Sequence, residues 1–157
     1  MFDVNPKIIS QTLESCWRQD TLEHYQEDEE YFALDFSKEK DARYAIRKWL
    51  KQSDWSDIPR KNLYRETLRY IITSGKGLEA DIWLPGIDDE NEYPSTDQED
   101  FNSWKKNYKN FLLILWDEWF HERFVPADLF QYRERIDDEF VQFPHMPELW
   151  KKPIYKD

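Results

Sequence analysis

The residues with the clearest capacity for chemistry are Glu118 and His121, which form a Glu-x-x-His motif at the end of a long aromatic segment. On a helix this spacing puts both side chains on one face, as in carboxylate-bridged di-iron bundles. Such bundles need two copies of the motif and two further carboxylates from facing helices. Neither His24 nor His145 has a carboxylate three positions before it, so this chain has one copy. We therefore assign no metal ligands and keep a metal-dependent enzyme using Glu118 and His121 as an alternative.

Other local patterns fall short of catalytic or cofactor motifs. The Gly75-Lys76 pair has no glycine five residues before Gly75 and no Ser or Thr after Lys76, so it is not a phosphate loop. The acidic run 88–92 lacks the glycine and the closing glutamate of a calcium loop. Cys16 lies at an apolar position of a predicted helix and is interpreted as a core residue. The sequence thus predicts no catalytic residue, no cofactor and no enzymatic activity.

Length and composition indicate a single domain. The chain has 157 residues, a formal net charge of −11, one cysteine and no basic segment followed by an apolar core at its start. A domain of this length can bury a core without disulfides. The longest apolar run, Phe111–Trp116, is far shorter than the roughly 20 residues that span a bilayer. We therefore expect a cytoplasmic protein that binds neither membranes nor the nucleic-acid backbone directly.

Charge is unevenly distributed along the chain. Residues 1–36 carry nine acidic and two basic residues, and residues 37–77 carry five acidic and eleven basic residues. Residues 78–100 carry nine acidic residues and no basic one. One interpretation is that the basic segment pairs with its acidic flanks inside the fold. The other is that an acidic segment faces outward and binds a basic partner.

The spacing of apolar residues and the scarcity of glycine, with only three in the chain, favour an all-α fold, a bundle of five to seven helices. The central element is a long helix at about 98–124, whose middle, Phe111–Trp116, is predicted to be buried on every side. At 24 residues, 101–124 would run about 36 Å. The remaining predicted helices cover 5–19, 21–36, 37–52, 59–75 and 126–140.

Two parts of the chain are predicted to lack regular structure. Residues at about 75–97 form one long acidic loop, and loops of this length in a compact domain are often functional. Residues 141–157, with three prolines, are predicted to form an extended C-terminal arm. The single domain would thus comprise residues 1–157, with the acidic loop leading into the long helix.

A small acidic domain that is rich in aromatic residues and lacks a catalytic motif is most simply a binding protein. Aromatic side chains anchor interfaces, and carboxylates steer basic partners. In size, in its acidic runs Glu27–Glu30 and Asp88–Glu92 and in the missing catalytic motif, the chain resembles the small acidic immunity proteins of bacterial toxin–immunity systems. The resemblance implies a cytoplasmic inhibitor that neutralises a basic partner, such as a toxin nuclease.

The predicted partner-binding residues lie in the acidic loop, and they are Trp83, Asp88, Asp89, Glu90, Glu92 and Tyr93. Two further functions stay open beside the inhibitor. One is a DNA mimic or regulatory adaptor, in which carboxylates imitate phosphates, and the other is the metal-dependent enzyme. The eight tryptophans are also compatible with a homodimer face.

Overall fold

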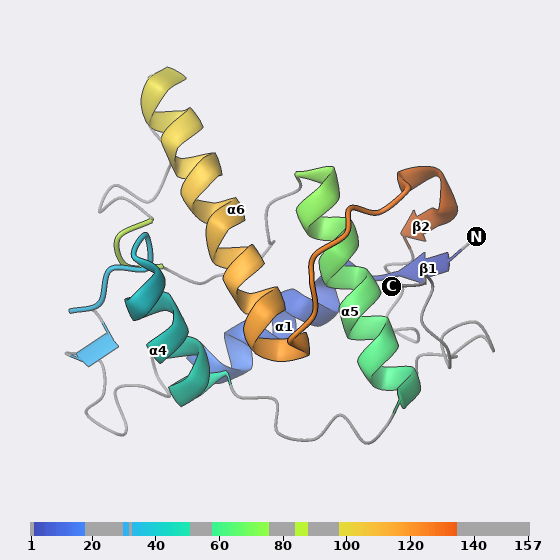
Figure 1. Ribbon diagram of the computed structural model, residues 1–157, viewed down its shortest axis with the longest axis horizontal. Coiled ribbons are helices and arrows are strands. Elements are labelled where there is room, and N and C mark those ends of the chain that lie inside the picture. The colour runs from blue at the N-terminus through green and yellow to red at the C-terminus, as the bar shows by residue number, and fades with distance from the viewer. Residues whose placement is uncertain are drawn as a thin grey trace. The chain divides into compact units, whose positions relative to one another are not determined.

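The computed structural model describes residues 2–17, 30–31, 33–50, 58–75, 84–87 and 98–134. In chain order they form β1 (Phe2–Val4), α1 (Pro6–Trp17), α4 (Glu39–Trp49), α5 (Ile58–Ser74), α6 (Gln98–Phe120), the 3-10 helix η1 (Leu129–Gln131) and β2 (Tyr132–Glu134) (Figure 1). The chain divides into two compact units. Unit 1 comprises Met1–Thr12, Gln52–Ala80 and Arg123–Asp157, and unit 2 comprises Leu13–Lys51 and Asp81–Glu122.

The predicted bundle of five to seven helices is wrong. The described residues contain four α-helices and a two-stranded parallel sheet. The helix predicted at 126–140 is replaced over its described part by η1 and β2, and the backbone of 33–38 forms turns and bends. The predicted C-terminal arm lies outside the described residues. The predicted acidic loop is described only at Gly75 and at 84–87.

The start of α1 follows the sequence signals. The Asn5 side chain accepts a hydrogen bond from the Lys7 backbone at 3.0 Å, which caps the helix, and Pro6 occupies its first position. The spacing of Ile8, Ile9 and Leu13 predicts one apolar face, and all three residues are buried.

Helix α5 begins near Pro59 and ends before Gly75, whose φ of +71° is the left-handed conformation that stops helices. Its apolar residues Leu63, Leu68, Ile71 and Ile72 are buried. The same spacing of apolar residues predicts that Arg65 and Arg69 face outward, and this prediction is wrong. Both are buried beside Glu66 of the same helix.

The parallel sheet in unit 1 joins two distant parts of the chain. Phe2 pairs with Tyr132, Asp3 with Arg133 and Val4 with Glu134. Val4 and Tyr132 are buried, and Phe2, Tyr70 and Ala127 pack against them. Strands of three residues are marginal alone, so side chains must reinforce the pairing. Arg133 does so with an ion pair to Asp3 at 2.8 Å.

Unit 2 is built on α4 and α6, which pack against one another. The buried face of α4 is formed by Ala42, Ala45 and Ile46. The Trp119 indole donates a hydrogen bond of 2.9 Å to the Leu50 carbonyl, which ties the end of α6 to the end of α4. Acidic residues in the first turn of α4 and basic residues in its last turn complement the helix dipole.

Helix α6 confirms the position of the predicted long helix but ends four residues earlier, at Phe120. His121 follows with a φ of +52°, which terminates the helix. Phe111, Leu115 and Trp119 are buried, whereas Leu113 and Ile114 are half-buried. The prediction of a middle buried on every side is therefore wrong, and α6 has one strongly apolar face. Within the described residues, none of the helices could span a bilayer.

Candidate functional site

The predicted partner-binding residues Trp83, Asp88, Asp89, Glu90, Glu92 and Tyr93 lie outside the described residues. The structure describes the short turn 84–87 between them. Leu84 and Ile87 are buried in unit 2, and the Ile87 amide donates to the Leu84 carbonyl at 3.1 Å. The acidic run therefore follows directly on a turn that is packed into unit 2.

This turn is fastened to the segment before α4. The Phe36 amide donates a 2.7 Å hydrogen bond to the Pro85 carbonyl. Gly86 has a φ of +82°, and a Cβ there would lie 2.0 Å from Asp35 Oδ1. The Asp35 amide in turn donates to Asp41 of α4 at 3.0 Å. Because a side chain at residue 86 would overlap Asp35, glycine is required there.

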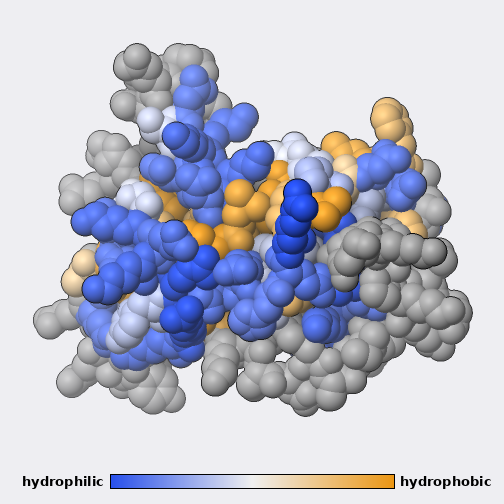
Figure 2. Space-filling view, in the orientation of Figure 1, coloured by the Kyte–Doolittle hydropathy of each residue, from blue (hydrophilic) through white to orange (hydrophobic). Residues whose placement is uncertain are grey.

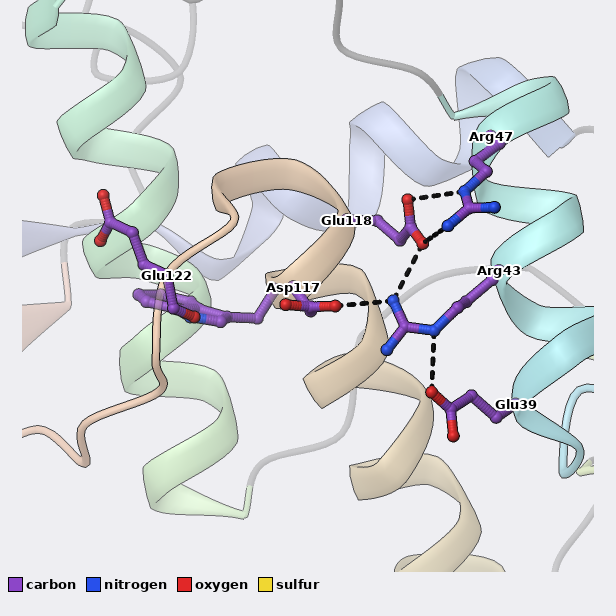
Figure 3. Close-up of polar contacts among 7 residues, drawn as sticks. Glu39, Arg43, Arg47, Asp117, Glu118 and Glu122 are labelled. Carbon is purple, nitrogen blue, oxygen red and sulfur yellow. Dashed lines mark hydrogen bonds and ion pairs between the residues drawn. The ribbon is translucent and has the colours of Figure 1, made fainter.

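Glu118 of the Glu-x-x-His motif is the centre of an ion-pair network between α4 and α6 (Figure 3). Arg43 donates to Glu118 at 2.9 Å and to Asp117 at 2.7 Å. Arg47 donates to the other Glu118 oxygen at 3.0 Å. Glu39, which lies on α4 one turn before Arg43, forms an ion pair of 2.9 Å with it. Both carboxylate oxygens of Glu118 therefore accept hydrogen bonds from arginine.

The ion pairs shift the pKa values of the residues that form them. Burial alone would raise the pKa of Glu118, but the hydrogen bonds from Arg47 and Arg43 outweigh this effect and lower it below its ordinary value. The hydrogen bond to Glu118 is the largest cause of the raised pKa of Arg43 and of Arg47. Glu118 therefore stays ionised at a lower pH than an ordinary glutamate does and acts as a structural anion.

These contacts bear on the alternative metal site. His121 lies beyond the end of α6 and is exposed, whereas Glu118 faces α4. Over the ranges that the structure covers, no three His, Cys, Asp or Glu side chains come together in a group that could hold a metal ion. In the described part of the chain, the geometry thus supports an ion-pair role for Glu118.

A second polar cluster on α4 involves the end of the acidic run 27–30. Lys48 donates to Glu30 at 2.6 Å, and the Tyr44 hydroxyl donates to the other Glu30 oxygen. The hydrogen bonds from Lys48 and then Tyr44 lower the pKa of Glu30. On the face shown in Figure 2, the surface over α4 is hydrophilic, and these pairs help to neutralise its basic residues.

The charged cluster on α5 is the feature that sequence reasoning missed. The exposed fractions of Arg65, Glu66 and Arg69 are 4%, 0% and 2%. Arg69 Nε lies 3.1 Å from Glu66 Oε2, and Arg65 donates to the Asn62 side chain at 2.6 Å. The Tyr132 hydroxyl also donates to Glu66. The i, i+3 spacing of Glu66 and Arg69 is the only local signal that could have suggested this pairing.

The tertiary structure sorts the charges between the two units. Counted over its full ranges, unit 1 has twelve acidic and twelve basic residues and no net charge. Unit 2 has twenty-one acidic and ten basic residues, so it carries the entire net charge of −11. The basic segment 37–77 is divided between the units, and Arg43 and Arg47 pair with α6 instead of the acidic segment 78–100.

Comparison with known proteins finds no match to any protein-family model, curated protein or solved structure.

Proposed function

We propose that this chain is a non-catalytic binding protein that inhibits a basic partner, such as a toxin nuclease, in the manner of an immunity protein. One observation carries the proposal: the net charge of −11 lies entirely in unit 2, the unit that includes both acidic runs, 27–30 and 88–92. A unit with a large charge of one sign attracts an oppositely charged protein and accelerates their association.

The internal ion pairs support this proposal. Arg43, Arg47 and Lys48 could have neutralised an acidic binding surface, but they are held by Glu118, Asp117 and Glu30. Glu118, Asp117 and Glu30 of unit 2 are therefore engaged within the fold, as is Glu39, which also pairs with Arg43. These pairs do not change the net charge of −11 on the unit, which would attract a basic partner.

The proposed contact residues are those that the sequence predicts, Trp83, Asp88, Asp89, Glu90, Glu92 and Tyr93. Trp83 and Tyr93 would supply aromatic anchors, and the carboxylates would supply steering and specificity. The packed turn 84–87 supports this assignment because it attaches the acidic run to the core of unit 2.

Affinity capture from a lysate of the source cell, with three baits, tests this function. The first bait is the wild-type chain, and the second carries D88N, D89N, E90Q and E92Q in unit 2. The third carries D54N, D57N, D137N and D138N in unit 1, which removes the same amount of negative charge. We expect the first and third baits to retain a protein of pI above about 9, and the second to lose it.

The salt dependence of the captured complex gives a second criterion. Raising the salt from about 50 mM to about 500 mM should release the partner, chiefly by slowing association. A partner that binds all three baits equally would contradict the assignment of the acidic loop. Failure of the wild-type bait to retain any basic protein would contradict the inhibitor function itself.

A further inference from the structure

Unit 2 holds a cation between two aromatic rings and a carboxylate. The Lys48 ammonium lies 5.1 Å from the centroid of the Trp49 ring and 5.9 Å from that of the Tyr44 ring. The same ammonium donates a hydrogen bond of 2.6 Å to Glu30 Oε2. Aromatic faces and carboxylates are the groups with which proteins recognise cationic side chains and ligands. Glu30, Tyr44 and Trp49 therefore form a cation site, and its occupant is a lysine of the same chain.

The groups that form the cation site are held by contacts that do not involve Lys48. The rings of Tyr44 and Trp49 meet at 88°, with their centroids 6.3 Å apart. The Trp49 ring also makes an edge contact with buried Tyr31, with 5.6 Å between the centroids. The Tyr44 hydroxyl donates to Glu30 Oε1, the oxygen that Lys48 does not use. The site should therefore persist when its lysine is removed or displaced.

The cation site is open to solvent. Tyr44 is 45% exposed, and the side chains of Glu30 and Lys48 are 40% and 33% exposed. An exposed ion pair contributes little to stability because water competes with it, so little is lost when another cation replaces the lysine. Tyrosine is also among the residues that most often anchor protein interfaces. A side chain of another protein can thus reach the site.

We propose that the cation site binds an arginine side chain of the basic partner, which displaces Lys48; this inference rests on the proposed function. A guanidinium is planar, so it can stack on the Tyr44 or Trp49 ring while its paired N–H groups donate to both oxygens of Glu30. The ammonium of Lys48 lies near the outer limit of about 6 Å for attraction to an aromatic face. Lys48 therefore fills the site in the free protein and is replaced by a better ligand.

An NMR titration with n-propylguanidinium tests the cation site without the partner. In K48A the site has lost its occupant, so the signals of the Trp49 indole N–H and the Tyr44 amide should shift saturably. The dissociation constant should be on the order of 1–10 mM, and the wild type should bind at least about tenfold more weakly because its lysine competes. n-Propylurea, the planar and uncharged analogue, should not bind.

Two variants serve as controls for this titration. K40A removes an exposed lysine from the same helix, and it should bind n-propylguanidinium no more tightly than the wild type does. The double variant E30Q/K48A should show no saturable shift, because the site has lost its anion.

The captured partner tests the exchange of cations. K48A and K40A each remove one positive charge from α4, so both should accelerate association with a basic protein to a similar extent. Only K48A should also slow dissociation, by at least about threefold, because the partner's arginine no longer competes with Lys48. Y44A should raise the dissociation constant at least about tenfold, because it removes an aromatic anchor.

Different results would overturn the two parts of the proposal. Equal shifts with n-propylurea and n-propylguanidinium, or equal binding by K48A and E30Q/K48A, would overturn the cation site. Equal dissociation rates of the partner from K48A and K40A would overturn the exchange. If the site bound n-propylguanidinium but the chain captured no basic protein, the proposed function and the role of a partner's arginine would be wrong and the cation site would stand.

Discussion

The Tyr132 hydroxyl donates a hydrogen bond of 2.7 Å to Glu66 Oε2, although the two residues are 66 positions apart. Glu66 is fully buried on α5 and also pairs with Arg69 at 3.1 Å. Tyr132 begins β2, so this contact holds the strand on the helix. Tyr70 adds a second link by donating to Glu134 at 3.0 Å.

Removal of the buried carboxylate should be severely destabilising. We expect E66A to lower the free energy of unfolding by about 3–5 kcal/mol, because the buried Arg69 loses its ion-pair partner. Urea titration followed by tryptophan fluorescence measures the change. Y132F should cost about 1–2 kcal/mol, and K61A on the same helix should stay within about 0.5 kcal/mol of the wild type. An E66A variant as stable as K61A would show that the cluster does not stabilise the fold.

The ion pairs of Glu118 should make stability depend on pH in the acid range. Its pKa is lowered in the folded state, so its contribution is complete above the unfolded pKa of about 4.3 and is lost as the pH falls through the folded value. We expect E118Q to cost about 1–2 kcal/mol at pH 7 and progressively less on acidification. Urea midpoints measured between about pH 3 and pH 7 test this.

The control for this prediction is E39Q, which alters an exposed pair with the same Arg43. It should change stability by no more than about 0.5 kcal/mol. If E118Q and the wild type differed in stability by the same amount at both ends of the pH range, the ionisation of Glu118 would not cause the pH dependence.

Gly86 should be the least replaceable of the described glycines. A Cβ at Gly86 would lie 2.0 Å from Asp35 Oδ1 and 2.9 Å from Asp35 Cα, whereas nothing lies within 4 Å of a Cβ at Gly75. Both residues have positive φ, which costs a non-glycine residue roughly 1–2 kcal/mol. We therefore expect G75A to lower the free energy of unfolding by only that amount and G86A to lower it by more. Thermal unfolding of the two variants, side by side, measures the difference, and equal losses would contradict the close approach.

The buried face of α6 should not tolerate a charge. Leu115 is fully buried, so L115D would bury an unpaired carboxylate and should unfold the protein. L115A should cost about 2–5 kcal/mol. Ile114 is only half-buried, and I114A should therefore cost less than L115A. Circular dichroism of L115D and urea titration of both alanine variants test these expectations, and a folded L115D would show that α6 is not central to unit 2.

Local sequence signals were sufficient for the start of α1, the end of α5 and the position of α6. Asn5 and Pro6 start α1, Gly75 ends α5, and the three- and four-residue spacing of aromatic residues locates α6. Each of these signals acts within a few residues, so it can be recognised without knowledge of the fold. The partner-binding residues of the acidic loop stay a prediction, because they lie outside the described residues.

The features that were predicted wrongly, the strand β2 and the buried arginines of α5, depend on contacts that the local sequence does not reveal. Tyr132–Glu134 forms a strand because Phe2–Val4 pairs with it, and no local pattern shows a partner 130 positions away. Arginine usually faces water, so local reasoning predicts Arg65 and Arg69 on the exposed face, but a buried carboxylate on the same helix stabilises them in the interior.

The charges of the chain also separate into a part determined by the sequence and a part determined by the fold. The amino-acid sequence by itself determined the total charge of −11 and its alternation along the chain. Only the tertiary structure decided that Arg43 and Arg47 of α4 pair with Asp117 and Glu118, and that all of the excess negative charge lies in unit 2. The physical reason is that an ion pair depends on distance in space, and folding determines which charges come close.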